Sequence, residues 1–292
     1  MATRIPVLKT YKLFIGGKFP RSESARYYQI KGPKGKLIAN AARGSRKDIR
    51  DAVRSAREAW KPWADRSAYN RGQILYRIAE ILEERRSVFV DEICAVTRSG
   101  RAAATTEVAK SVDRLIWYAG WADKYMQLFS TVNPVASPYW NFSYPDSTGV
   151  VGIVAPEEKS LLGLISKIAP AMASGNTCVV IASESAPLSS ITFAEVLAAS
   201  DVPSGVVNII TGFKAELTEP LARHMDVNAI DYSGRDEATI KALQEAGALN
   251  VKRVIIRRDP HGESWLDDSR AQSPYWISEL TETKTAWHPV GV

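Results

Sequence analysis

The chain has 292 residues, of which 45% are hydrophobic and 24% are charged. This composition is typical of a folded globular protein and excludes a disordered chain, a collagen-like repeat and a disulfide scaffold. The formal net charge is +6, but residues of both signs are mixed along the whole chain, so the basic excess is weak support for a nucleic-acid partner.

The cysteine and histidine positions argue against a metal centre. Cys94 and Cys178 are the only cysteines, and neither lies in a CxxC motif, which fits a reducing compartment. His224, His261 and His288 have no metal-ligand spacing to one another. The N-terminus lacks the apolar segment of a signal peptide, and no apolar run is long enough to cross a membrane. We therefore expect a cytoplasmic protein without a metal site or a membrane partner.

The first part of the chain has the periodicity of helices. Ser45 and Asp48 have the spacing of a helix N-cap and its capping-box partner, and the helix that they begin is expected to end near residues 60–62. A short strand and two further amphipathic helices are expected at 12–15, 74–82 and 108–119. Residues 1–138 are therefore interpreted as a layer of short strands and helices.

An aromatic and β-branched region follows. Residues 139–144 and 150–154 are rich in strand-forming residues and flank a turn with Pro and Gly at 145–149. We expect a hairpin or arm over 139–154.

Strands and helices then alternate. Apolar strands are expected at 150–154, 177–182, 206–210, 228–232 and 252–256, with helices that begin near Ser160, Pro187, Lys214 and Arg235. This order predicts an α/β fold with a parallel sheet of about five strands and helices on both faces. Residues 259–274 are polar and aperiodic and are expected to form a connecting loop, and 276–287 are expected to form a final strand.

Common catalytic motifs are absent from the sequence. It has no HExxH, GxSxG or GxGxxG motif, and the glycines of 32–36 have the wrong spacing for a P-loop. We expect that segment to be a turn between strands.

Successive segments of the chain resemble the NAD(P)-dependent aldehyde dehydrogenase superfamily. They occur in family order at 14–18, 52–63, 118–122, 149–153, 171–177 and 203–208. Several independent landmarks in the correct order are more specific than any single motif. The resemblance covers residues 11–256 and implies a Rossmann-like nucleotide-binding unit over 150–258.

The resemblance also implies a reaction, and the sequence departs from it. In the family a Cys thiolate attacks the aldehyde, an Asn side chain holds the oxyanion and a Glu activates water. Glu158 stands at the position of that Asn, and Arg257 stands at the position of that Glu. An ionised carboxylate repels an oxyanion, and a guanidinium cannot accept a proton. No Cys follows Cys178, which lies in an apolar strand and is expected to be a buried core thiol, so no catalytic residue is assigned.

The cofactor site that the resemblance implies is eroded. Ile181 replaces the Lys that contacts the ribose, whereas the Glu of the same site is kept as Glu184. Lys214 replaces a glycine that follows Gly212, and a side chain there obstructs the close approach of a dinucleotide. The residues that still favour NAD or NADP binding are Pro156, Glu184, Gly212, Ser233 and Gly234.

Residues 278–287 resemble the last strand of complete family members, which belongs to their oligomerisation arm. The resemblance therefore implies a chain without the catalytic domain, with 259–274 as a connecting loop in its place and 275–292 as an oligomerisation strand. The alternative that this strand only completes the chain's own arm stays open.

These features lead to three hypotheses about function. The first is a catalytically inactive accessory or regulatory subunit that assembles through its arm with a full-length aldehyde dehydrogenase or with itself. The second is an NAD(P)-binding aldehyde oxidoreductase component, which senses the cofactor or uses a partner's catalytic domain. The third, a nucleic-acid binder, is disfavoured because its basic residues alternate along a strand and do not form one face. Those residues are Lys252, Arg253, Arg257 and Arg258.

Overall fold

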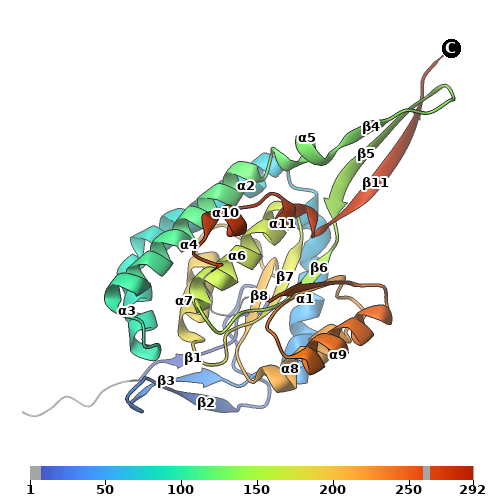
Figure 1. The fold of residues 1–292 in the computed structure, drawn as a ribbon. Coiled ribbons are helices and arrows are strands. Elements are labelled where there is room, and N and C mark those ends of the chain that lie inside the picture. The colour runs from blue at the N-terminus through green and yellow to red at the C-terminus, as the bar shows by residue number, and fades with distance from the viewer. Residues whose placement is uncertain (1–7, 259–263, 292) are drawn as a thin grey trace, which may run out of the picture.

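The computed structural model describes residues 8–258 and 264–291. Its centre is a five-stranded parallel sheet in the order β10-β9-β6-β7-β8. Figure 1 labels β6, β7 and β8 of this sheet. These strands are β6 (Val150–Val154), β7 (Thr177–Ile181), β8 (Val207–Ile210), β9 (Ala229–Ser233) and β10 (Arg253–Arg257). The prediction of a five-stranded parallel sheet is confirmed, and the ends of each strand lie within one residue of the predicted segment.

Helices cover both faces of this sheet. On one face lie α6 (Ser160–Ala173) and α7 (Leu188–Ala198), and on the other lie α1 (Arg46–Ala64), α8 (Lys214–Ala222) and α9 (Glu237–Ala248). Alternate strand residues enter two separate cores: Val151 packs in the core on the α6 side, and Val150 packs in the core on the α8 side. Burial on both faces explains why these strands are continuous apolar runs in the sequence.

The N-terminal helices form a further layer outside α6 and α7. The helices of this layer are α2 (Ala68–Glu84), α3 (Arg86–Val96) and α4 (Arg101–Trp121), which are followed by α5 (Tyr125–Phe129). The two predicted amphipathic stripes lie in α2 and α4, whereas α3 and α5 were not predicted. The layer is visible beside α6 in Figure 1.

Helix α1 begins as predicted but ends later. The capping box is confirmed, because Asp48 N donates to Ser45 Oγ and Ser45 N donates to an Asp48 carboxylate oxygen. The prediction that the helix ends at 60–62 is wrong, since it continues through Pro62 to Ala64. Pro62 has no backbone N–H and cannot donate a helical hydrogen bond. The next side chain, Trp63, is buried and packs this last turn against the core.

A small sheet precedes α1. Its strands are β1 (Thr10–Tyr11), β2 (Tyr27–Lys31) and β3 (Leu37–Ala42), in the order β1-β3-β2. The turn predicted at 32–36 joins β2 to β3 and is confirmed. The prediction of a strand at 12–15 is wrong. Phe14 and Ile15 form only isolated bridges, and Phe14 exchanges two backbone hydrogen bonds with Ile209 of the edge strand β8.

The predicted hairpin between 139–144 and 150–154 is also wrong. Strand β5 (Tyr139–Ser147) pairs with β4 (Thr131–Asn133) on one side and with β11 (Thr281–Pro289) on the other, and β6 belongs to the central sheet. Residues 145–147, expected to be a turn, instead pair with 281–283 of β11. The chain changes sheet at Gly149, whose φ of +132° favours glycine and whose N–H donates to Asn176. We call the sheet of β4, β5 and β11 the arm, which projects from the body in Figure 1.

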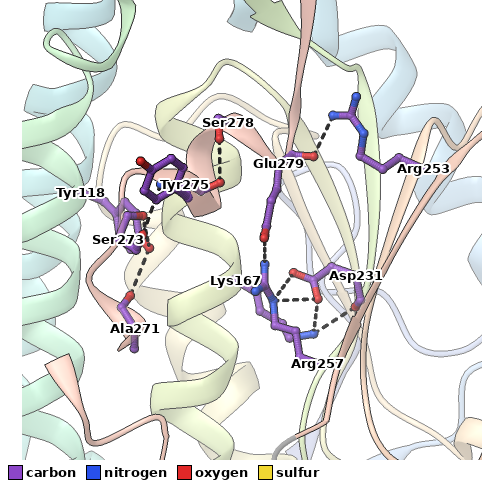
Figure 2. Close-up of polar contacts among 10 residues, drawn as sticks. All are labelled: Tyr118, Lys167, Asp231, Arg253, Arg257, Ala271, Ser273, Tyr275, Ser278 and Glu279. Carbon is purple, nitrogen blue, oxygen red and sulfur yellow. Dashed lines mark hydrogen bonds and ion pairs between the residues drawn. The ribbon is translucent and has the colours of Figure 1, made fainter. Parts of the chain in front are cut away.

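The C-terminal segment is more ordered than the sequence predicts. Residues 264–274, expected to be loop, contain α10 (Asp268–Ala271), and the expected strand over 276–287 is preceded by α11 (Tyr275–Ser278) and begins only at Thr281. Residues 259–263 of the predicted loop lie outside the described residues. Arg114 and Tyr118 of α4 explain the difference, because they donate to the carbonyls of Trp265 and Ala271 at 3.0 and 3.1 Å. Figure 2 shows the Tyr118 contact.

Trp265 is expected to anchor this segment to the body. Only 2% of its side chain is exposed, so Trp265→Ala removes a large buried apolar group and should lower the free energy of unfolding by about 3 kcal/mol. Tyr275→Ala, at a residue that is 66% exposed in the same segment, is the control and should change it by less than about 0.5 kcal/mol. Urea unfolding of both variants checks this, and equal losses would contradict the anchoring role.

Candidate functional site

One cavity, which we call the main cavity because the ends of three central strands line it, opens at the carboxyl edge of the central sheet, between α8 and α9. Its volume is about 490 Å3, which lies within the range of about 300–1,000 Å3 that is usual for small-molecule sites. In parallel α/β sheets, ligands bind at this edge. Apolar residues of the two helices form its walls: Ala215, Ala222, Ala242, Leu243 and Ala246.

Most of the residues singled out from the sequence meet at this cavity. Pro156 and Glu158 follow β6, Ser233 and Gly234 end β9, and Arg257 ends β10. Glu158 is exposed, and Ser233 is 8% exposed. The Ser233 hydroxyl has no hydrogen-bond partner among the described residues.

Two of the predicted cofactor residues lie elsewhere. Glu184 lines a second, more open cavity together with Tyr28 and Phe213. Its carboxylate accepts a hydrogen bond from the backbone N of Lys214, the first residue of α8, at 3.0 Å. Gly212 lines neither cavity: a Cβ there would approach Leu217 Cδ1 to 2.9 Å, so this glycine is needed for packing.

An ion pair between Glu157 and Lys214 stands between the two cavities. Glu157 and Lys214 pair with each other, and both side chains line both cavities. Lys214 Nζ also donates to the carbonyl of Ala155 at 2.5 Å. The sequence analysis missed Glu157, and the signal available for this pair was an acidic residue after one strand and a basic residue at the start of a helix.

The Glu157 carboxylate is strongly held in its ionised form. It accepts hydrogen bonds from Ser183 Oγ, from Ser185 Oγ and N, and from Glu184 N, at 2.6–3.0 Å. Burial raises its pKa, but the Lys214 charge and the hydrogen bonds from Lys214 and Ser185 outweigh burial and lower the pKa to about 2.

The far side of the main cavity is closed by a buried charge network. Arg257 Nε donates to both oxygens of Asp231 at 3.1 and 3.0 Å, and its NH2 group donates to Glu279 at 2.7 Å (Figure 2). Asp231 also accepts from Lys167 Nζ at 2.7 Å, and the Arg257 guanidinium lies 3.8 Å from the centre of the Trp276 ring. Burial, together with the charges of Arg257 and Lys214, outweighs the effect of Asp231 and lowers the pKa of Lys167 to about 8.

Asp231 and Arg257 stay charged in this network. Burial raises the pKa of Asp231, but the charges of Arg257 and Lys167 lower it by more than burial raises it. Burial lowers the pKa of Arg257, but Asp231 and Glu279 raise it by more. A lone Lys in the apolar helix α6 and a lone Asp in the apolar strand β9 were the sequence signals for this buried pair.

The thiol of the central sheet is buried. Cys178 is fully buried in β7, so the prediction of a core thiol is confirmed, and burial raises its pKa far above neutrality. No cluster of three or more His, Cys, Asp or Glu side chains suited to a metal was found within 8–258 and 264–291. Nor does any helix in these ranges have the length and apolarity that a membrane crossing requires.

The residues that the resemblance implies for NAD or NADP do not form one continuous site. Glu184 lies on one side of the Glu157–Lys214 pair, and Ser233 and Gly234 lie on the other. A dinucleotide that contacts all of them would have to span both cavities, past the Glu157–Lys214 pair.

Comparison with known proteins gives the same fold and a consistent family. The sequence model of the aldehyde dehydrogenase family matches residues 19–258. The chain is 30% identical over 257 residues to omega-crystallin of Enteroctopus dofleini, which covers 87% of this chain and 51% of that protein. It is 30% identical over 254 residues to aldehyde dehydrogenase 1A1 of Gallus gallus, which covers 85% of this chain and 49% of that protein.

A solved structure extends the comparison. The NAD+ complex of aldehyde dehydrogenase from Bacillus cereus is similar with a TM-score of 0.81 and 25% identity, over 89% of this chain and 55% of that chain. The chain thus spans about half the length of the curated relatives that it matches.

Reversing the charge of Arg257 should destabilise the fold. Arg257→Glu leaves buried Asp231 without one cation and places a third carboxylate between Asp231 and Glu279, so the free energy of unfolding should fall by about 3 kcal/mol or more. Arg258→Glu changes an exposed pair with Glu237 and should cost less than about 1 kcal/mol. Urea unfolding followed by tryptophan fluorescence measures both, and a loss of similar size in the two variants would count against the network.

The Glu157 carboxylate should make stability depend on acid pH. Its pKa is lower in the folded chain than the value of 4.5 for a free Glu, so its contribution is complete above pH 4.5 and is lost as the pH falls toward 2. Because the group is half exposed, the contribution is about 1 kcal/mol or less. The stability difference between wild type and Glu157→Gln should therefore shrink between pH 6 and pH 3 in urea unfolding. A difference that is constant across this range would refute the prediction.

Proposed function

The chain belongs to the aldehyde dehydrogenase family, and from that premise we propose that it is a catalytically inactive accessory or regulatory subunit. It assembles through its arm with a full-length aldehyde dehydrogenase or with a second copy of itself. The arm is the observation that carries this proposal.

The arm has the features of an assembly surface. It is a three-stranded sheet that projects from the body, and its long strand β11 is an edge strand (Figure 1). An edge strand presents unpaired backbone N–H and C=O groups that another chain can pair with. Trp140 and Trp287 lie on this sheet with 49% and 58% of their surfaces exposed. Exposed aromatic residues of this kind are typical of protein interfaces.

The rest of the chain supports an inactive role. The guanidinium of Arg257 stands where the resemblance implies a base, and it is engaged by Asp231 and Glu279. The exposed carboxylate of Glu158 stands at the position where the resemblance implies an Asn that donates to the oxyanion. The one cysteine in the central sheet, Cys178, is buried in the core. Side chains in these states supply neither a base, nor an oxyanion donor, nor a nucleophile.

We propose that the chain is cytoplasmic, and its two unpaired cysteines support this. Cys94 and Cys178 are both free thiols, which is usual in the reducing cytoplasm.

Affinity purification of the tagged chain from its native cells tests the proposal. We expect a full-length aldehyde dehydrogenase, or a second copy of the chain, to be identified by mass spectrometry and to account for the mass of the intact complex. Recovery of the chain as a monomer, together with failure to bind the purified full-length enzyme at about micromolar concentration, would overturn it.

Substitutions on the arm should weaken this assembly without unfolding the chain. Trp140→Lys and Trp287→Lys each place a charge on an exposed arm position, and we expect a loss of about 2 kcal/mol, or roughly thirtyfold in the dissociation constant. Tyr76→Lys on α2, at a residue that is 51% exposed, is the matched control on the body and should bind as the wild type does. Analytical ultracentrifugation gives the affinities. Weakening by the control alone would place the interface on the body instead.

A further inference from the structure

The Glu157–Lys214 ion pair joins two parts of the chain that border the cleft. Glu157 lies in the segment between β6 and α6, and Lys214 is the first residue of α8. We propose that this pair is a fixed bridge that closes the cleft to NAD and NADP, so that the chain keeps the family's nucleotide-binding fold in a cofactor-independent form.

The Lys214 end of the bridge is held at three points. Its ammonium pairs with Glu157 and donates to the carbonyl of Ala155, the residue that follows β6, at 2.5 Å. Its backbone N donates to the Glu184 carboxylate at 3.0 Å. The Lys214 side chain is mostly buried, so moving it away from Glu157 would break contacts within the fold rather than release a solvated charge.

The Glu157 end is held more tightly. One carboxylate oxygen accepts from Glu184 N and pairs with Lys214, and the other accepts from Ser183 Oγ and from the N and Oγ of Ser185. Both oxygens are therefore saturated with donors. A different rotamer of Glu157 would leave these donors without their partner.

The position of the bridge decides what the cleft can hold. The main cavity contains Ser233 and Gly234, the second cavity contains Glu184, and Glu157 and Lys214 line both. A ligand that contacts Glu184 and Ser233 at the same time therefore has to extend past this pair, because Glu157 and Lys214 lie in the walls of both cavities.

The charges of the bridge also oppose a dinucleotide. The diphosphate of NAD or NADP is anionic. Of the cations that line the main cavity, Lys214 is neutralised by Glu157, and Arg257 is neutralised by Asp231 and Glu279, whereas Arg235 is exposed. Displacing Lys214 from Glu157 would leave an ionised carboxylate facing the diphosphate, and like charges at short distance repel.

Calorimetric titration of the purified full chain with NAD+ and NADP+ tests this inference. We expect wild type to bind neither cofactor below about 1 mM and the Glu157→Ala/Lys214→Gly variant to bind at least one of them about tenfold or more tightly than wild type. Loss of the bridge should also lower the Tm of the variant without ligand, and adding the bound cofactor should raise it again.

Lys241→Ala/Glu245→Ala is the matched control, because it removes an exposed Lys–Glu pair on α9 that lies away from the bridge. It should leave cofactor binding as in wild type. Tight binding of NAD+ or NADP+ by the wild-type chain would overturn the inference whether or not the variant folds, and so would a folded bridge variant with no gain in affinity. Neither result bears on assembly through the arm, because the titration uses the chain alone.

Discussion

The buried carboxylate of Asp231 is the point at which three parts of the chain are held together. It lies in β9, receives Lys167 from α6, and pairs with Arg257 of β10, which continues to Glu279 (Figure 2). A buried carboxylate without cations would cost several kcal/mol, so its partners cannot move independently. The arm strand β11 begins shortly after Glu279, at Thr281. The charge network thereby fixes where the arm leaves the body.

The sequence was sufficient to predict the elements that are determined by a local motif or by a repeating apolar pattern. The five central strands could be predicted because burial on both faces makes each a continuous apolar run, and the start of α1 could be predicted because the Ser45–Asp48 box lies within one turn. The pairing of β5 with β11 could not, because it joins segments far apart in the sequence. The short helices α10 and α11 also escaped prediction, since contacts from Arg114 and Tyr118 of α4 hold that segment.

The same distinction applies to the candidate site. Parallel strands end at one edge of a sheet, and this places Pro156, Ser233 and Arg257 around one cavity, as their positions after three strands suggested. The separation of Glu184 from that cavity depends instead on two side chains, Glu157 and Lys214, that meet only in three dimensions. Their positions, after one strand and at the start of a helix, can be read from the sequence, but the sequence does not indicate that the two side chains meet.

The cleft and the arm differ in how their unusual residues are accommodated. In the cleft, two of the charges that depart from the family pattern have partners within the chain: Lys214 pairs with Glu157, and Arg257 pairs with Asp231 and Glu279. Such pairing stabilises the fold without a ligand, since unpaired buried charges are strongly destabilising. On the arm, Trp140 and Trp287 remain exposed. Contacts within the chain therefore account for Lys214 and Arg257 in the cleft but leave these aromatic side chains uncovered, and a partner on the arm would cover them.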